Sequence, residues 1–76
     1  MKKIGLLGCG AIGTQIALAI DSGKISAVLT HVYDDSKDAS SRLVQKLKNK
    51  PEIVENFHLL SSHPVDIVVE AASQNA

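Results

Sequence analysis

This 76-residue sequence is poor in aromatic side chains and carries no net charge. Tryptophan is absent, and one tyrosine and one phenylalanine are present, which argues against modules that stack nucleic-acid bases on aromatic rings. Lysine plus arginine and aspartate plus glutamate each number 8, so bulk charge favours neither nucleic acid nor an anionic membrane. We therefore expect no nucleic-acid partner.

The sequence also lacks a cysteine pair and any long apolar run. A single cysteine cannot form an internal disulfide, which is typical of a reducing compartment. No apolar stretch approaches the ~20 residues that span a bilayer. The apolar segment after Met1-Lys2-Lys3 is interrupted by glycines, unlike the core of a signal peptide. These features predict a cytoplasmic location and no membrane partner.

The strongest motif present is the segment Gly8–Gly13, with the sequence GCGAIG. The apolar segment Lys2–Leu7 precedes it and reads as a buried parallel strand. A helical pattern follows it, and the acidic pair Asp34-Asp35 comes about twenty residues later. Strand, glycine loop, helix, second strand and acid in this order predict the phosphate-binding turn of a dinucleotide-binding βαβ unit.

Each glycine of this loop has its own expected task. Gly8 permits the tight turn out of the strand, Gly10 lets a pyrophosphate approach the backbone, and Gly13 lets the helix pack closely on the strand. The amides of Ala11, Ile12 and Gly13 are expected to face the phosphates at the helix N-terminus. The alternative is a strand-to-helix turn with a purely structural role.

Asp34 ends the second expected strand, where an acid can accept hydrogen bonds from the adenosine ribose hydroxyls. A carboxylate there repels a 2′-phosphate, so NAD is expected as the cofactor, with NADP possible but less favoured. Asp35 follows where an arginine would help NADP, and the only arginine, Arg42, is well inside the next helix. Alternatively, Asp34 and Asp35 only cap that helix.

The remaining pattern predicts further strands and helices. The first helix should cover Ala11–Asp21 and end at Gly23; the second strand is Ser26–Tyr33. A second helix, capped by Asp35 or Ser36, should run until Pro51 stops it. Further along we expect a short strand at Glu52–Val54, a helix over Phe57–Ser62, and a strand at Val65–Ala71. The expected buried residues of the helices are Ile12, Ile16, Ile20, Ala39, Leu43, Leu47, Phe57 and Leu60.

The predicted fold class is α/β: a partial Rossmann (doubly wound) parallel sheet in the order 3-2-1-4, with helices on both faces. The fourth strand is then an open edge, which invites pairing with a second copy of the chain. A complete domain needs two such halves, and 76 residues is about half a typical domain. We therefore expect residues 1–76 to be the amino-terminal part of a dinucleotide-binding domain, with the substrate domain absent; a complete small domain is the alternative.

Small residues follow the last strand, at Ala71, Ala72 and Ser73. They would leave space for the cofactor near the topological switch point, or form a loop without a ligand. Cys9 is expected to pack behind the turn, although a helix N-terminus could lower the pKa of its thiol and make it redox-active. Three histidines, His31, His58 and His63, show no metal-ligand spacing, so neither a metal nor a catalytic residue is assigned.

The two ends of the chain together resemble the amino-terminal domain of the L-aspartate dehydrogenase family. The segments that carry the resemblance are KKIGLLGCGAIGT at the start and VDIVVEAASQNA at the end, of which Val68–Gln74 is the more specific. The resemblance implies an NAD(P)-dependent oxidation of L-aspartate to iminoaspartate, which in many organisms feeds NAD biosynthesis. It also implies that the loop residues, Asp34 and Ala71–Ser73 contact the cofactor. It places the catalytic histidine and the substrate-binding residues in a later domain, so this chain alone should be inactive.

The sequence is also compatible with two other functions. One is a non-catalytic NAD-sensing regulatory domain, which would use a similar loop and acid. The other keeps the enzyme class and changes the substrate, as in a homoserine-dehydrogenase-like or a dihydrodipicolinate-reductase-like enzyme.

Overall fold

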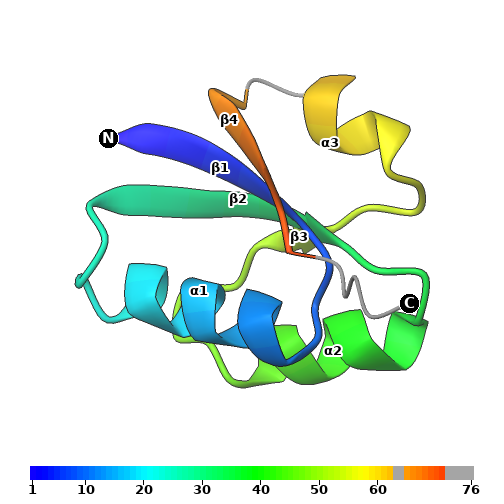
Figure 1. The fold of residues 1–76 in the computed structure, drawn as a ribbon, viewed down its shortest axis with the longest axis horizontal. Helices are drawn as coiled ribbons and strands as arrows, with labels where there is room; N and C mark the ends of the chain where they lie inside the picture. The colour runs from blue at the N-terminus through cyan, green and yellow to red at the C-terminus, as the bar shows by residue number, and fades with distance from the viewer. Residues whose placement is uncertain (63–64, 72–76) are drawn as a thin grey trace.

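The computed structural model describes residues 1–62 and 65–71 (Figure 1). Strands and helices alternate along the chain, as the sequence pattern predicts. The elements are β1 (Lys2–Leu7), α1 (Ala11–Asp21), β2 (Ala27–Tyr33), α2 (Lys37–Gln45), β3 (Glu52–Ile53), α3 (His58–Ser62) and β4 (Ile67–Glu70).

The strands of the described residues form one sheet in the order β3-β2-β1-β4, and every neighbouring pair is parallel. This confirms the predicted order. The pairing of β1 with β2 shifts register between Ile4 and Gly5. Helices α1 and α2 lie on one face of the sheet and α3 lies on the other (Figure 1). The arrangement follows from the right-handed crossovers that parallel strands require.

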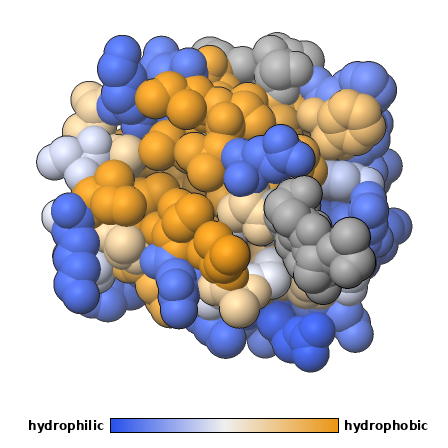
Figure 2. All heavy atoms as spheres, viewed as in Figure 1, coloured by the Kyte–Doolittle hydropathy of each residue, from blue (hydrophilic) through white to orange (hydrophobic). Residues whose placement is uncertain are grey.

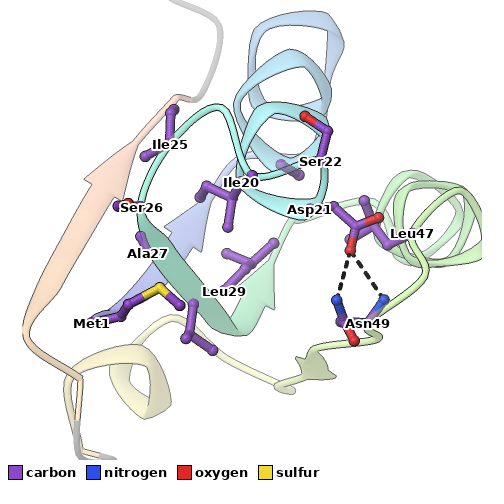
Figure 3. Close-up of a pocket in the computed structure, with 13 residues that line it drawn as sticks. Met1, Ile20, Asp21, Ser22, Ile25, Ser26, Ala27, Leu29, Leu47 and Asn49 are labelled. Carbon is purple, nitrogen blue, oxygen red and sulfur yellow. Dashed lines mark hydrogen bonds between the residues drawn. The ribbon is translucent and has the colours of Figure 1, made fainter.

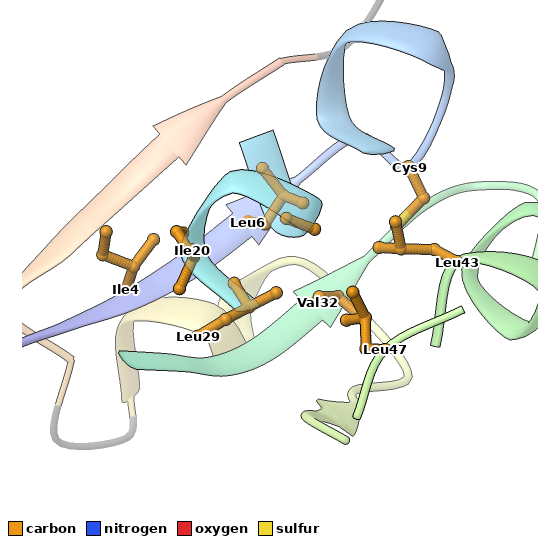
Figure 4. Packing of buried hydrophobic residues seen from close by; sticks show 9 residues of the cluster. Ile4, Leu6, Cys9, Ile20, Leu29, Val32, Leu43 and Leu47 are labelled. Atoms are coloured by element: carbon orange, nitrogen blue, oxygen red, sulfur yellow. The ribbon is translucent and has the colours of Figure 1, made fainter. Parts of the chain in front are cut away.

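The main hydrophobic core lies between the sheet and the pair α1 and α2 (Figure 4). Leu6 and Val32 supply its centre from the two middle strands, and both are fully buried. On the opposite face, Leu60 of α3 is buried against the sheet. Gly5 lies beneath it, since a Cβ at this position would lie in ordinary van der Waals contact with the Leu60 side chain, at 3.4 Å. The residues of the main core are Ile4, Leu6, Cys9, Ala17, Ile20, Leu29, Val32, Leu43 and Leu47.

Helix α1 ends as its sequence predicts. Gly23 adopts a left-handed conformation with a φ of 87°. Its amide donates to the carbonyl of Ile20 at 3.1 Å, and the amide of Lys24 donates to the carbonyl of Ala19 at 2.9 Å. This pair of bonds is a Schellman motif, which satisfies carbonyls left over at the end of the helix.

Helix α2 is shorter than expected. It ends at Gln45, so Pro51 does not stop it. The next turn tightens, because the amide of Leu47 donates to the carbonyl of Val44, three residues back. The amides of Lys48 and Asn49 then donate to the carboxylate of Asp21, at 2.8 and 3.0 Å. The Asp21 side chain, at the end of α1, therefore accepts hydrogen bonds from amides that would donate within the helix if α2 were longer.

Two predicted core residues are on the surface. Ile12 is 61% exposed, because the first turn of α1 meets the loop through the buried Gly13 instead. Phe57 is 53% exposed, since α3 begins only at His58 and the Phe57 ring packs against the His58 ring, with 4.2 Å between ring centroids. The expected strand Val65–Ala71 is also shorter, at Ile67–Glu70. Asp66 just before it exchanges two hydrogen bonds with the backbone of Lys3.

The surface carries a substantial apolar area. Figure 2 shows apolar side chains gathered over the part of this face that β4 and β1 occupy in Figure 1. Ile67 and Val68 of β4 are among the exposed apolar residues. Within the described residues β4 pairs only with β1, so its other edge is open, as the sequence analysis predicts. None of the described helices is long and apolar enough to cross a membrane.

Candidate functional site

The carboxyl ends of three neighbouring strands meet around the glycine loop. The amide of Gly8 donates to the carbonyl of Tyr33 at the end of β2, at 2.8 Å. The amide of Ala71 donates to the carbonyl of Leu7 at the end of β1, at 2.7 Å. The loop, the tip of β2 and the first residue after β4 are thereby brought together. Of the other small residues named above, Ala72 and Ser73 lie outside the described residues.

The three glycines of the loop occupy three different environments. Gly8 has a φ of 104°, a conformation that residues with a side chain rarely adopt, so it makes the turn out of β1. At Gly13 a Cβ would overlap the carbonyl oxygen of Gly8, so only glycine lets α1 approach the loop this closely. At Gly10 a Cβ would meet no atom of residues 1–62 and 65–71 within 4 Å. The space above Gly10 is therefore open to a ligand.

The N-terminus of α1 presents donors toward that space. Its first intrahelical bond runs from the amide of Thr14 to the carbonyl of Gly10, at 2.8 Å, and no side chain caps the helix. The amides of Ala11–Gly13 have no hydrogen-bond partner among the described residues. Gly10 and Ile12 are exposed. A loop with free amides, a helix dipole and no side chain at its centre fits a diphosphate group.

Asp34 is half-buried at the tip of β2 and is held by two backbone amides. Its Oδ2 accepts from the amide of Cys9 at 2.6 Å, and its Oδ1 accepts from the amide of Ser36 at 2.8 Å. The hydroxyl of Ser36 in turn accepts from the amide of Ala39, so Ser36 is the residue that caps α2. Sequence reasoning identified the position of Asp34 but missed its bond to the glycine loop, 25 residues away.

Cys9 is enclosed beneath the loop. Only 4% of it is exposed, and its Sγ lies 3.8 Å from the carbonyl oxygen of Tyr33. Burial raises the pKa of the Cys9 thiol to about 11, and the neighbouring charge of Asp34 acts in the same direction. A raised pKa keeps the thiol protonated, so the structure favours a packing role over a redox role.

The other titratable residues near the site have local partners. Asp35 is exposed and accepts from the hydroxyl of Tyr33 at 3.0 Å, which raises the pKa of Tyr33. His31 is buried in β2, with its Nδ1 2.8 Å from the hydroxyl of Thr30. Among residues 1–62 and 65–71, no group of three histidine, cysteine or acidic side chains could hold a metal ion.

The surface of the described residues also has hollows, one far from the glycine loop and one beside Asp34. A pocket of about 600 Å³ is formed by the end of α1, the start of β2 and the segment after α2 (Figure 3). It includes Met1 and Ala27, so it lies at the amino ends of the strands, opposite the glycine loop. A smaller pocket of about 230 Å³ lies between Asp34, the first turns of α2, and Ile53 and Val54. Sequence reasoning missed it, because segments distant along the chain assemble its walls.

Comparison with known proteins agrees with this geometry. Residues 8–76 match the family described as homoserine dehydrogenase, NAD binding domain. The chain belongs to this family of NAD-binding domains. The match covers the glycine loop from its first residue, together with β2, Asp34 and β4, and NAD is the cofactor that the family's description names.

Similar proteins align with the whole of this chain. L-aspartate dehydrogenase of Nitrosopumilus maritimus is 79% identical over all of the chain. The proteins of that name from Methanosarcina mazei and Methanocaldococcus jannaschii are 49% and 39% identical. The chain covers 28% of each of these three relatives. No solved structure matches it.

Proposed function

We propose that this domain binds the diphosphate of NAD on the amides of Ala11–Gly13 and the adenosine ribose at Asp34. The observation that carries the proposal is the open, side-chain-free space at Gly10 in front of unpartnered helix amides. Gly8 and Gly13 shape the loop, and Ala71 lies beside it through the bond to Leu7. We include Ala72 and Ser73 in the proposed cofactor site because they directly follow Ala71 in the sequence.

The electrostatics of the tip of β2 favour NAD over NADP. Asp34 and Asp35 place two carboxylates next to the proposed ribose position, where a 2′-phosphate would add further negative charge. Lys37 shares the small pocket beside Asp34 and is the nearest cation in sequence. Because one lysine only partly offsets the two carboxylates, the net negative charge here supports a preference for NAD in which NADP still binds weakly.

The parent activity that we propose is that of an L-aspartate dehydrogenase. It is supported by relatives of that name, which align with the entire chain at up to 79% identity. Since the chain spans less than a third of their length, we propose that residues 1–76 are the amino-terminal part of the nucleotide-binding domain. The open edge of β4 and the apolar surface around it support this, because further chain or a second copy would cover them.

In that enzyme NAD accepts a hydride from the carbon that bears the amino group of aspartate. The residues described here contribute binding and orientation: the amides of α1 hold the diphosphate, and Asp34 fixes the ribose. We assign no catalytic residue to this chain and expect it to be inactive alone. The protein is expected to act in the cytoplasm as a homo-oligomer and to supply an imine for NAD biosynthesis.

Homoserine dehydrogenase is the second candidate, because the matching family carries that name. The two activities can be separated with the longer protein that contains this chain. It should reduce NAD in the presence of L-aspartate and should do so far more slowly with L-homoserine. Activity with homoserine alone would reverse the assignment, and NAD binding without turnover of either substrate would favour a regulatory domain.

Binding itself can be tested on the 76-residue chain. Titration with NADH, followed by nicotinamide fluorescence or calorimetry, should show saturable binding, weaker than that of the longer protein. NADPH should bind less tightly than NADH. Amide NMR shifts should move at Ala11–Gly13 when NADH is added. Shifts confined to the pocket at the opposite end of the strands would contradict the proposed site.

A further inference from the structure

The carboxylate of Asp34 connects two parts of the site that are far apart in sequence. One oxygen accepts from the amide of Cys9 at 2.6 Å and the other from the amide of Ser36 at 2.8 Å. Cys9 directly precedes Gly10, the N-cap of α1, and Ser36 is the N-cap of α2. A single side chain therefore links the glycine loop to the start of the second helix.

Both partners of this carboxylate are donors, and this restricts what can replace it. An ionised carboxylate offers about four acceptor positions, two on each oxygen. The two amides use one position on each oxygen, which leaves one position free on each. Two amides hold the carboxylate in a fixed orientation, and the remaining two acceptors match the two hydroxyls of a ribose 2′,3′-diol.

We propose that Asp34 is a positioning residue for the diphosphate loop as well as a ligand for the ribose. This inference rests on the proposed function, because it concerns the same NAD site. The bond from the Cys9 amide holds the loop in the conformation in which the next amides, from Ala11 onward, face the open space at Gly10. Removal of the carboxylate should weaken diphosphate binding even when the ligand has no ribose hydroxyls.

An asparagine at this position is the sharpest test. Its side-chain amide has one acceptor oxygen and one NH₂ donor. The oxygen can accept from one of the two backbone amides, but the NH₂ group then faces the other backbone N–H and cannot form a hydrogen bond with it. Asp38→Asn is the matched control, because it makes the same substitution and removes the same charge. Asp38 is exposed in the first turn of α2 and has no part in the proposed site.

The experiment compares ADP with 2′,3′-dideoxy-ADP on the longer protein that contains this chain, by calorimetry. In the Asp34→Asn variant both ligands should bind about tenfold more weakly than in the wild type, the size expected for loss of a charge-assisted hydrogen bond. Asp38→Asn should change neither affinity by more than about twofold. If Asp34→Asn weakens ADP but leaves dideoxy-ADP unchanged, Asp34 acts on the ribose alone and the positioning role is wrong. If the wild type binds neither ligand, the proposed function fails instead.

A measurement on the wild type removes any dependence on how the variant folds. The amide of Cys9 should exchange with solvent more slowly than that of Ala11, which has no partner among the described residues. Equally rapid exchange at both positions would overturn the inference.

Discussion

The carbonyl oxygen of Gly8 lies in the space where the Cβ of any other residue at position 13 would be placed. This contact fixes the distance between the start of α1 and the turn out of β1. Gly10, between these two glycines, has no such neighbour. The first and last glycines of the loop are therefore required by the fold itself, and the middle glycine is required only when a ligand is present.

Gly13→Ala should destabilise the domain without a ligand. The methyl group must displace the Gly8 carbonyl, which is backbone and cannot rotate away as a side chain would. We expect the free energy of unfolding to fall by about 1–3 kcal/mol, as for other overpacked sites. Urea unfolding followed by circular dichroism measures the change.

Gly10→Val should keep the fold intact and weaken ligand binding. No atom in the described part of the chain lies within 4 Å of the position of its Cβ, so this part of the fold has room for the side chain. The same side chain fills the space proposed for the diphosphate, and NADH binding should fall by at least about a hundredfold, a loss of roughly 3 kcal/mol. Calorimetry with NADH checks the affinity, and circular dichroism checks that helix content is retained. A Gly10→Val chain that binds NADH normally would remove the loop from the site.

The sequence predicted the larger features of this fold because each one depends on a local pattern. The glycine loop, the apolar strand before it and the glycine at the end of α1 are signals within a few residues of each other. The parallel order then follows from crossover rules that hold for most sheets. In the same way, the acid at the tip of β2 was placed correctly from its distance to the loop.

Features that depend on contacts distant in sequence were missed. Ile12 fits the helical spacing of a buried residue, but the first turn of α1 meets the loop through Gly13 and leaves Ile12 exposed. The end of α2 is set by Asp21, a residue of another helix, which no local pattern around Gln45 reveals. The hydrogen bond from the Cys9 amide to Asp34 likewise joins residues distant in sequence, so no local pattern reveals it.

Asp34→Ser should narrow the preference for NAD over NADP. Loss of the carboxylate removes one of the two charges that repel a 2′-phosphate, and Lys37 in the adjoining pocket then faces a single carboxylate, that of Asp35. We expect NADH affinity to fall by about tenfold, and NADPH affinity to fall less or to rise. Parallel titrations with the two reduced cofactors give the ratio. An unchanged ratio would exclude a ribose role for Asp34.

The Cys9 thiol should make the domain less stable at alkaline pH. Its pKa is raised from 9.0 to about 11 in the folded state, so folding favours the protonated form. This contribution is complete below pH 9 and is lost as the pH rises toward 11, at a cost of about 2 kcal/mol. The free energy of unfolding of the wild type should therefore fall more steeply between pH 8 and 11 than that of Cys9→Ala. Equal slopes would show that burial does not perturb this thiol.

Asp21 should make the domain sensitive to acid. The backbone amides of Lys48 and Asn49 donate to its carboxylate and hold its pKa below the ordinary value of 3.8. Because the folded pKa is depressed, the stabilisation is present above pH 3.8 and is lost as the pH falls through the folded pKa. Asp21→Asn should be less stable than the wild type at pH 7, since an NH₂ group replaces one acceptor, and the two proteins should converge once acid has protonated the Asp21 carboxylate in the folded state. Glu55→Gln is the control, because Glu55 is exposed and makes no hydrogen bond within the described part of the chain. If the urea midpoints of Asp21→Asn and Glu55→Gln follow the same pH dependence, the bridge from α1 to the segment after α2 does not contribute to stability.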